Sequence, residues 1–199
     1  MGSAEDDPVS AVVSSLLAVP VPPSRAVAPA VDGGVPAEPG LYAWWAPPGA
    51  VPGIVGPPHP SAALELLYIG LARSGGAARS TLRSRVVGQH IRGTTGQSTL
   101  RRGLASLLGE REGWRTRWTT RPVLINQDEL RLSEWMVERL QLTWAVHPQP
   151  WTVEDDVIEA LLPPLNQAAN RGHPLHEHVR AARKRWRDEA ATQRKTVEQ

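Results

Sequence analysis

The hydrophobic positions of this chain follow a period of two in some segments and a helical period in others. Residues 41–46 and 64–71 are short, rich in aliphatic and aromatic side chains, and bounded by glycine or proline. Such runs are typical of β-strands. Residues 114–120, in which bulky and polar side chains alternate, and residues 142–146 predict two further strands.

Helical spacing of apolar side chains is found between and after these segments. Leu82, Val86 and Val87 would share one face of a helix, and leucines 100, 104, 107 and 108 repeat that spacing. Asp128 is placed to cap a helix, and Thr152 opens another whose first turn is acidic, where the helix dipole favours anions. The helices are therefore expected over residues 78–89, over residues 99–108, after Asp128, from Thr152 to the prolines at 163 and 164, and from Pro174 onward.

Proline and glycine divide the chain into three parts. Residues 1–39 read as an N-terminal tail and a Pro/Gly-rich linker, residues 40–170 as the folded domain, and residues 171–199 as a charged C-terminal helix. Between the first two strands the prolines exclude regular structure and predict a long hairpin loop. The order of elements predicts an α/β (α+β) fold, a small mixed, mainly antiparallel sheet of three or more strands flanked by helices.

The chain contains no cysteine. This excludes disulfides, thiolate zinc sites and a cysteine nucleophile, and it fits a cytoplasmic protein. The apolar run at residues 11–19 is too short to span a bilayer, and it follows three acidic residues where a signal peptide would be basic. We therefore expect no targeting segment and no membrane association. Nothing in the sequence indicates an oligomeric state.

Charge is distributed unevenly although the net charge is only +2. Between Glu65 and Glu110 there is no acidic residue, whereas arginines are frequent. The arginines of this stretch are Arg73, Arg79, Arg83, Arg85, Arg92, Arg101 and Arg102. A segment of this kind suits a polyanion, most commonly a nucleic-acid backbone. A solvated basic face is the structural alternative.

Two tripeptides and two helical motifs resemble the GIY-YIG nuclease family. Gly40-Leu41-Tyr42 and Tyr68-Ile69-Gly70 lie on the first two predicted strands, and Leu82-Arg83-Ser84-Arg85 lies on the following helix. The segment from Glu154 to Asn166 is similar to the closing motif of the family, in which a glutamate opens a helix and an asparagine follows a proline. The resemblance covers residues 40–166 and implies a GIY-YIG-like fold.

The resemblance implies a metal-dependent endonuclease that hydrolyses phosphodiester bonds in nucleic acid, most commonly DNA. Glu154 would bind magnesium or manganese, because a single carboxylate suits an ion that keeps most of its waters. Tyr42 would act as general base or orient the attacking water, which needs positive charge nearby to lower its pKa. Arg85 would hold the scissile phosphate, and Tyr68 would position the phosphate or support Tyr42.

Further site residues follow from the same resemblance. Gly70 would let the backbone approach the substrate, and Asn166 would fix the loops of the site by hydrogen bonds. Where many relatives carry lysine this chain has Leu71, and Arg73 is the candidate substitute. His90, a candidate proton carrier, follows Arg85 by five residues instead of about one helical turn, which would require the helix to unwind at Gly88. The remaining candidates for substrate binding are Arg83, Arg92, Arg101 and Arg102.

Several alternatives remain open at the level of sequence. Glu159 competes with Glu154 but lies about 140° around the same helix, and Arg83 competes with Arg85. Three histidines at positions 173, 176 and 178 suggest a metal cluster, although their spacing also suits an ordinary loop. The basic C-terminal helix could contact phosphates or be a solvated face. At the level of function, the rivals are an inactive nucleic-acid-binding domain and a protein-interaction module that uses the Pro-rich loop.

Overall fold

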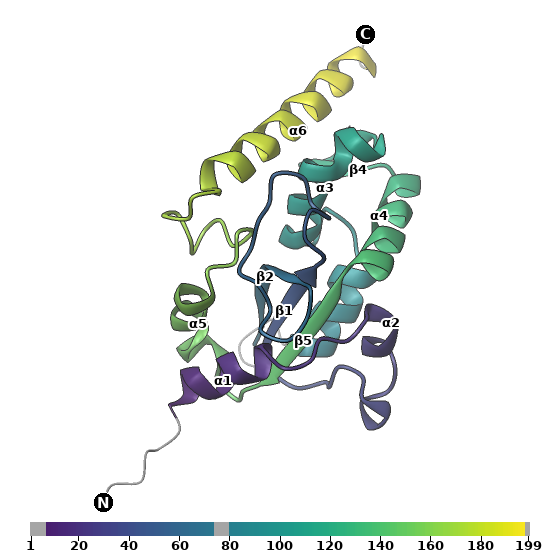
Figure 1. The fold of residues 1–199 in the computed structure, drawn as a ribbon. Helices are drawn as coiled ribbons and strands as arrows, with labels where there is room; N and C mark the ends of the chain where they lie inside the picture. The colour runs from purple at the N-terminus through teal and green to yellow at the C-terminus, as the bar shows by residue number, and fades with distance from the viewer. Residues whose placement is uncertain (1–6, 74–79, 198–199) are drawn as a thin grey trace, which may run out of the picture.

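The computed structural model describes residues 7–73 and 80–197, with side chains as far as residue 194 (Figure 1). Arg79, the glycines at 75 and 76, and the expected helix start at residue 78 lie outside the described residues. The elements, in chain order, are α1 (Pro8–Leu16), α2 (Pro23–Ala26), η1 (Ala30–Asp32), β1 (Gly40–Ala46), β2 (Glu65–Ala72), η2 (Ser84–Ile91), α3 (Thr99–Glu112), β3 (Thr116–Trp118), β4 (Pro122–Leu124), α4 (Asn126–Arg139), β5 (Gln141–Val146), η3 (Pro150–Thr152), α5 (Glu154–Leu161) and α6 (His176–Val197).

The central sheet has three strands in the order β2-β1-β5, and both pairs are antiparallel. Tyr42, in the middle of β1, lies opposite Gly70 on β2 and opposite Trp144 on β5. The α+β fold with a small antiparallel sheet flanked by helices is therefore confirmed. The expected strands at 114–120 and 142–146 are present, but the first is shorter than expected and forms a separate hairpin with β4.

Alternation along β1 directs side chains into two different cores. Tyr42 and Trp44 belong to a large cluster that includes Leu104 of α3 and Met136 of α4. The residues that alternate with them, Leu41, Ala43 and Trp45, join a smaller cluster with helices α1 and α5. The sheet is therefore a layer between two sets of helices, and the two tyrosines of the resembling motifs share one face.

The segment before β1 packs on the sheet. Helix α1 is capped by the Asp7 carboxylate, and its Leu16 is completely buried. Val21 exchanges backbone hydrogen bonds with Leu142 of β5, and Val35 is also buried. The described part of the expected tail and linker thus contains short helices held against the domain, because its apolar side chains find a partner surface there. The division of the chain at residue 40 stays a prediction.

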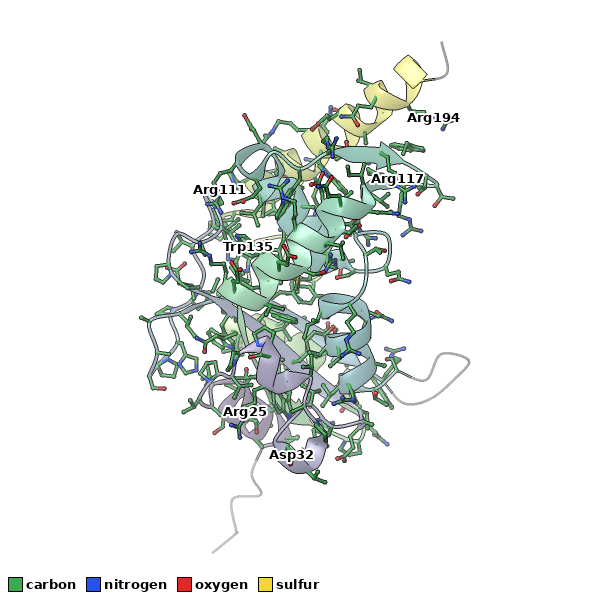
Figure 2. The ribbon with its side chains drawn as sticks, turned by 90° about the vertical axis from the view of Figure 1, so that its right-hand side faces the viewer. Arg25, Asp32, Arg111, Arg117, Trp135 and Arg194 are labelled. Atoms are coloured by element: carbon green, nitrogen blue, oxygen red, sulfur yellow. The ribbon has the colours of Figure 1, made fainter. Side chains whose placement is uncertain are left out.

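The β3–β4 hairpin and α6 form the end of the molecule opposite the N-terminal segment with α2 and η1. Figure 2 shows Arg117 of the hairpin at one end and Arg25 and Asp32 of the N-terminal segment at the other. Helix α6 packs on α3 and β3, where Val179, Ala182 and Trp186 are buried. No helix among residues 7–73 and 80–197 is long and apolar enough to cross a membrane.

Candidate active site

Tyr42 is packed against Gly70 across the β1–β2 pair. The Tyr42 ring has no exposed surface, and a Cβ atom added to Gly70 would lie 2.3 Å from Tyr42 Cζ and Oη. No other residue type therefore fits opposite the tyrosine without displacing it. The sequence suggested that Gly70 admits the substrate, and the structure gives it another reason, which is room for the Tyr42 side chain.

The Tyr42 hydroxyl meets His90 on the following helix. Tyr42 Oη and His90 Nε2 are 2.6 Å apart and hydrogen-bonded, and their ring centroids are 5.3 Å apart. His90 also lies edge-on to Trp44 and Tyr68, and it is almost completely buried. His90, whose spacing from Arg85 differs from the one that the resemblance implies, is therefore hydrogen-bonded to the tyrosine of the first motif.

A π-helical turn explains how His90 reaches this position. Residues 84–91 form a π-helix, and beyond it the Arg92 N–H donates to the Val87 carbonyl at 3.0 Å. In a π-helix each hydrogen bond spans five residues instead of four, so five residues make about one turn. The spacing between Arg85 and His90 thus becomes about one turn. The helix widens and does not unwind at Gly88, in contrast to the expectation from sequence.

Burial keeps both members of the Tyr42–His90 pair neutral. Burial, and to a smaller degree Tyr68, raises the pKa of Tyr42 far above its usual range, although the charge of Arg85 opposes the shift. Burial, with the charges of Arg85 and Arg101, lowers the pKa of His90 to about 3. The expectation that nearby positive charge lowers the tyrosine pKa is therefore corrected, because the cost of burying a phenolate exceeds the help from Arg85.

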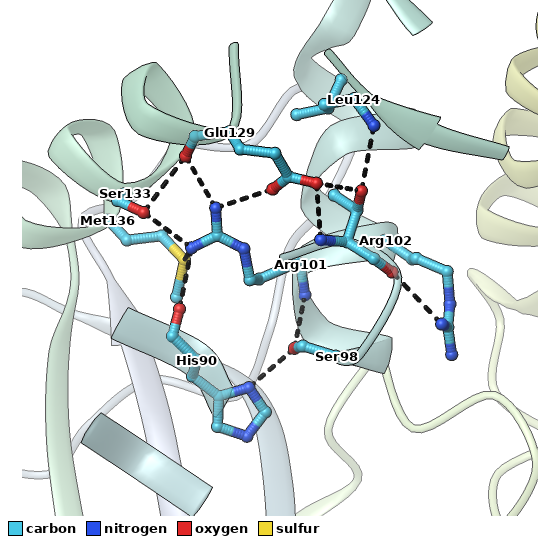
Figure 3. A network of polar contacts seen from close by, with 9 residues as sticks. His90, Ser98, Arg101, Arg102, Leu124, Glu129, Ser133 and Met136 are labelled. Carbon is cyan, nitrogen blue, oxygen red and sulfur yellow. Dashed lines mark hydrogen bonds and ion pairs between the residues drawn. The ribbon is translucent and has the colours of Figure 1, made fainter. Parts of the chain in front are cut away.

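A buried polar network holds the His90 ring and backbone in place on the side away from Tyr42 Oη (Figure 3). His90 Nδ1 is 2.7 Å from Ser98 Oγ, and Ser98 in turn accepts the Arg101 N–H. The Arg101 guanidinium donates to the His90 carbonyl at 2.8 Å and forms an ion pair with Glu129 at 2.9 Å. Glu129 also accepts hydrogen bonds from the N–H and hydroxyl of Thr95. Each group in this chain fixes the next, so the imidazole has a defined orientation.

Tyr68 and Glu154 line a common pocket of about 270 Å³. Tyr68 comes from β2, and its hydroxyl lies 3.2 Å from Thr99 Oγ1 at the start of α3. Glu154 is the first residue of α5 and lines the same pocket with Asp155. Glu159 is exposed and does not line this pocket. The acidic helix end that the sequence singled out therefore faces the second tyrosine.

Asn166 joins this pocket to the sheet. Its side-chain oxygen accepts the Ile69 N–H at 2.9 Å, and its amide donates to the Ile69 carbonyl at 2.8 Å. The Leu165 N–H donates to the Leu67 carbonyl at 3.0 Å. Asn166 thus pairs with both backbone groups of Ile69, which lies between Tyr68 and Gly70 on β2. These bonds hold the segment after α5 against the strand that carries Tyr68.

The Glu154 carboxylate has the properties of a cation ligand. Burial and the neighbouring Asp155 raise the pKa of Glu154, and the charges of Arg73 and Arg85 act in the opposite direction. Among the described residues, no donor is hydrogen-bonded to this carboxylate and no cluster of three His, Asp or Glu could hold a metal ion. A half-buried carboxylate without protein donors suits an ion bound largely through its own waters.

The charges of Arg85 and Arg73 both act on the Glu154 carboxylate and oppose the rise of its pKa. Arg85 donates to Gln89 Oε1 at 2.5 Å, and its buried Nε has no partner among the described residues. Arg73 is exposed, with its guanidinium 5.8 Å from the Trp151 ring. Both guanidinium groups are therefore available to an anion near Glu154.

The other predicted arginines lie elsewhere. Arg83 donates to the carbonyls of Val27, Ala28 and Val35, so it fastens the N-terminal segment to the helix. Arg101 is completely buried in the network behind His90. Arg92 is exposed at the end of η2, and Arg102 donates to the carbonyls of residues 95 and 96 while lining a second pocket. The arginine-rich stretch is thus divided between structural and accessible positions.

Sequence reasoning missed the residues that support the site. Ser98, Thr99 and Glu129 were not singled out, although a serine directly before a helical leucine pattern is a capping signal. Glu129 carries no such signal, because its partner Arg101 is 28 residues away in the chain. The histidine cluster at residues 173–178 does not form a metal site among the described residues. Trp45 is buried and donates to Thr143 Oγ1, so it is not available to a substrate.

The comparison with known protein families agrees with this arrangement. Residues 40–188 match the family described as the GIY-YIG catalytic domain. No curated protein and no solved structure shows a significant match to the chain. The matched region begins at the first motif, contains Tyr42, Tyr68, His90 and Glu154, and extends into α6. The chain belongs to the GIY-YIG catalytic domain family, which implies nuclease activity on nucleic acid.

Proposed function

We propose that this protein is a divalent-metal-dependent endonuclease that hydrolyses phosphodiester bonds in DNA. The observation that carries the proposal is the chain of contacts from Tyr42 to Glu154. Tyr42 is hydrogen-bonded to His90, His90 lies edge-on to Tyr68, and Tyr68 shares a pocket with Glu154, while the charge of Arg85 acts on both Tyr42 and Glu154. These residues offer a proton acceptor, a cation for phosphate and a carboxylate for a metal. Phosphodiester hydrolysis requires all three.

Each residue has a defined task in the proposed reaction. A magnesium or manganese ion at Glu154 would polarise a phosphate oxygen and stabilise the charge that develops there. Arg85 neutralises the phosphate through the terminal N–H groups of its guanidinium that Gln89 does not use. Tyr68, at the pocket beside Glu154, orients the phosphate. The bond between phosphorus and the water oxygen forms as the bond to the leaving sugar oxygen breaks.

The Tyr42–His90 pair supports a proton relay. In the tautomer whose proton is on Nδ1, neutral His90 accepts the Tyr42 hydroxyl proton at Nε2 and donates to Ser98. Tyr42 then receives the proton of the attacking water as it passes its own to His90, so no buried phenolate forms. Burial opposes the charge that His90 gains, so this charge is transient and the proton passes on to solvent, while the leaving sugar oxygen takes up a proton from solvent. Because Tyr42 is fully covered, a water reaches its oxygen only after neighbouring side chains move. His90 thereby takes the part of proton carrier that the sequence left uncertain.

The test is cleavage of a labelled DNA duplex by the full-length protein with magnesium, with manganese and with EDTA. We expect cutting only with metal, and loss of it in Glu154→Gln, which removes the ligand charge while keeping its shape. Glu159→Gln is the matched control, because it changes the same residue type on the exposed side of the same helix. Cutting that survives Glu154→Gln, or that EDTA leaves unchanged, contradicts the proposed metal site.

The same assay separates the proposal from its rivals. An inactive nucleic-acid-binding domain would bind the duplex without cutting it under every metal condition. Cleavage of an RNA of the same sequence in preference to DNA would replace DNA as the substrate. The cytoplasmic location rests on the absence of cysteine and stays a prediction.

A further inference from the structure

A second, strongly basic pocket lies between α6, the β3–β4 hairpin and the start of α3. Its volume is about 490 Å³, within the range of about 300–1,000 Å³ that ligand pockets occupy. Among the described residues that line it there is no aspartate or glutamate. Its lining includes the arginines Arg102, Arg121, Arg180, Arg183 and Arg187. Such a concentration of one charge in a concave surface is a site for an anion.

The inner arginines are held close together, and none of the described acidic residues pairs with Arg102, Arg121 or Arg183. Burial and the charge of Arg121 lower the pKa of Arg102, and burial and the charge of Arg102 lower the pKa of Arg183. The Arg183 Nε atom is buried and has no hydrogen-bond partner among the described residues. Arg180 pairs only with Glu177, at 3.0 Å on the exposed face of α6. The mutual repulsion of these cations would be relieved by a bound anion.

Two tryptophans complete the pocket. Trp118 of β3 is half-buried, and Trp186 of α6 is 6% exposed with its Nε1 atom buried and unpartnered. The accessible part of the Trp118 indole can stack on a nucleic-acid base, and the buried Trp186 forms the inner wall of the pocket. Arginines beside a stacked base bind the phosphates that connect it to its neighbours. An acidic peptide would use the arginines but has no group that requires the indoles. The combination therefore favours a nucleotide over a carboxylate-rich protein segment.

The basic pocket adjoins the candidate active site. Arg183 and Gln167 line both this pocket and the pocket of Tyr68 and Glu154. A single strand that passes Glu154 can therefore reach the tryptophans with its next nucleotides. Bases in a duplex are paired and stacked on their neighbours, so an unpaired nucleotide enters such a pocket at a lower cost in free energy than a paired one.

We propose that the pocket of Trp118, Trp186 and Arg183 holds an unpaired nucleotide next to the phosphodiester that is cut at Glu154. The protein would then prefer DNA with a single-stranded extension over a blunt duplex. This inference rests on the proposed function, which identifies the ligand as nucleic acid. It adds that the substrate has an unpaired nucleotide next to the cleaved bond, a feature that the catalytic residues do not select.

Binding without cleavage tests the proposal directly. Fluorescence anisotropy with the full-length protein in EDTA would compare a blunt duplex with the same duplex carrying a single-stranded extension. We expect tighter binding of the extended DNA. Trp118→Ala should weaken that binding about 5- to 150-fold and leave the blunt duplex unchanged, because the lost stacking involves only the unpaired base. Trp118→Phe should retain most of the preference.

Two arginines of α6 provide a matched test of charge. Arg187 lines the pocket, whereas Arg185 on the same helix does not. Arg187→Gln should reduce the slope of log affinity against log salt for the extended DNA by about 0.7, the value for one phosphate of a single strand. Arg185→Gln should leave the slope unchanged. Thermal melting of every variant verifies that the fold is intact.

The outcomes that overturn the inference are specific to it. Equal weakening of both DNAs by Trp118→Ala would mean that the pocket has no preference for an unpaired base. Displacement of the extended DNA by polyglutamate, with no effect of Trp118→Ala, would assign the pocket to an acidic protein segment. If Trp118→Ala changes nothing while Glu154→Gln abolishes cutting, this inference fails and the proposed function stands. If binding of the extended DNA depends on Trp118 but no DNA is cut, this inference stands and the proposed function fails.

Discussion

Tyr42 and His90 are hydrogen-bonded at 2.6 Å although 48 residues separate them in the chain. The contact joins the central strand of the sheet to a π-helical turn, and both side chains are buried. Burial opposes a charge on either group, so the pair is neutral until a substrate supplies a proton to transfer. This relationship makes the histidine and the tyrosine one functional unit.

Removing the Tyr42 hydroxyl should therefore abolish most of the proposed reaction. Tyr42→Phe keeps the ring that packs on Gly70 but removes the group that passes the proton to His90. We expect the single-turnover cleavage rate to fall about 10²- to 10⁴-fold, the contribution of acid–base catalysis, with a small change in Tm. Tyr68→Phe should have a smaller effect, because its hydroxyl is bonded to Thr99 and not to His90. Equal losses in the two variants would argue against the relay.

The buried histidine should make the protein sensitive to mild acid. The pKa of His90 is about 3 in the folded protein and near 6.5 when unfolded, so between these values only the unfolded chain binds the proton. The contribution of His90 to stability is complete above pH 6.5 and declines as pH falls toward 3. We expect about 2 kcal/mol less stability at pH 5 than at pH 7 from this group.

Denaturant unfolding at a series of pH values would measure this effect. The variant His90→Gln lacks the titrating group, so the difference between its pH profile and that of the wild type isolates the contribution of His90. In nuclear magnetic resonance spectra, the His90 ring of the folded protein should remain neutral at pH 5. Parallel pH profiles for the two proteins, or a ring that titrates near pH 6.5, would contradict the prediction.

Glycine at position 70 should be required for stability as well as for the site. A Cβ atom there would lie 2.3 Å from the Tyr42 ring, so Gly70→Ala should cost about 1–3 kcal/mol and displace the hydroxyl from His90. Gly88→Ala is the matched control, since a Cβ at Gly88 has no neighbour within 4 Å. It should leave stability unchanged or raise it slightly. Chemical denaturation compares the two, and similar losses would mean that the Tyr42 contact is not the reason for Gly70.

Glu129 should be among the residues most sensitive to substitution. It neutralises Arg101, which is completely buried, so Glu129→Gln leaves an uncompensated charge in the core. We expect a loss of about 3–5 kcal/mol in the free energy of unfolding. Glu177→Gln breaks an exposed pair with Arg180 and should leave Tm unchanged. A Tm of Glu129→Gln equal to that of the wild type would show that the network in Figure 3 is not needed for folding.

Some parts of the fold and the site follow from local sequence. The apolar runs of β1 and β2 and the leucines of α3 specify their own elements, because period-two and helical patterns each bury one face. The tripeptides around Tyr42 and Tyr68, Arg85, and the acidic start of α5 at Glu154 were found from short motifs. Each of these signals is contained in a few neighbouring residues.

Tertiary structure decided the parts that depend on distant residues. The sequence did not predict that Arg83 and Arg101 are used inside the fold, because the carbonyls of residues 27–35 and the Glu129 carboxylate become their neighbours only after folding. The same holds for the basic pocket, which combines α3, the β3–β4 hairpin and α6.

His90 illustrates the distinction most directly. By sequence alone His90 follows Arg85 by five residues, and in an ordinary α-helix this spacing would point the His90 side chain away from that of Arg85. The π-helix changes five residues into about one turn, and the sheet supplies Tyr42 as the partner. Local patterns thus determined which residues are candidates for the chemistry, whereas packing determined which of them meet, since hydrogen bonds and burial depend on neighbours that the linear order does not specify.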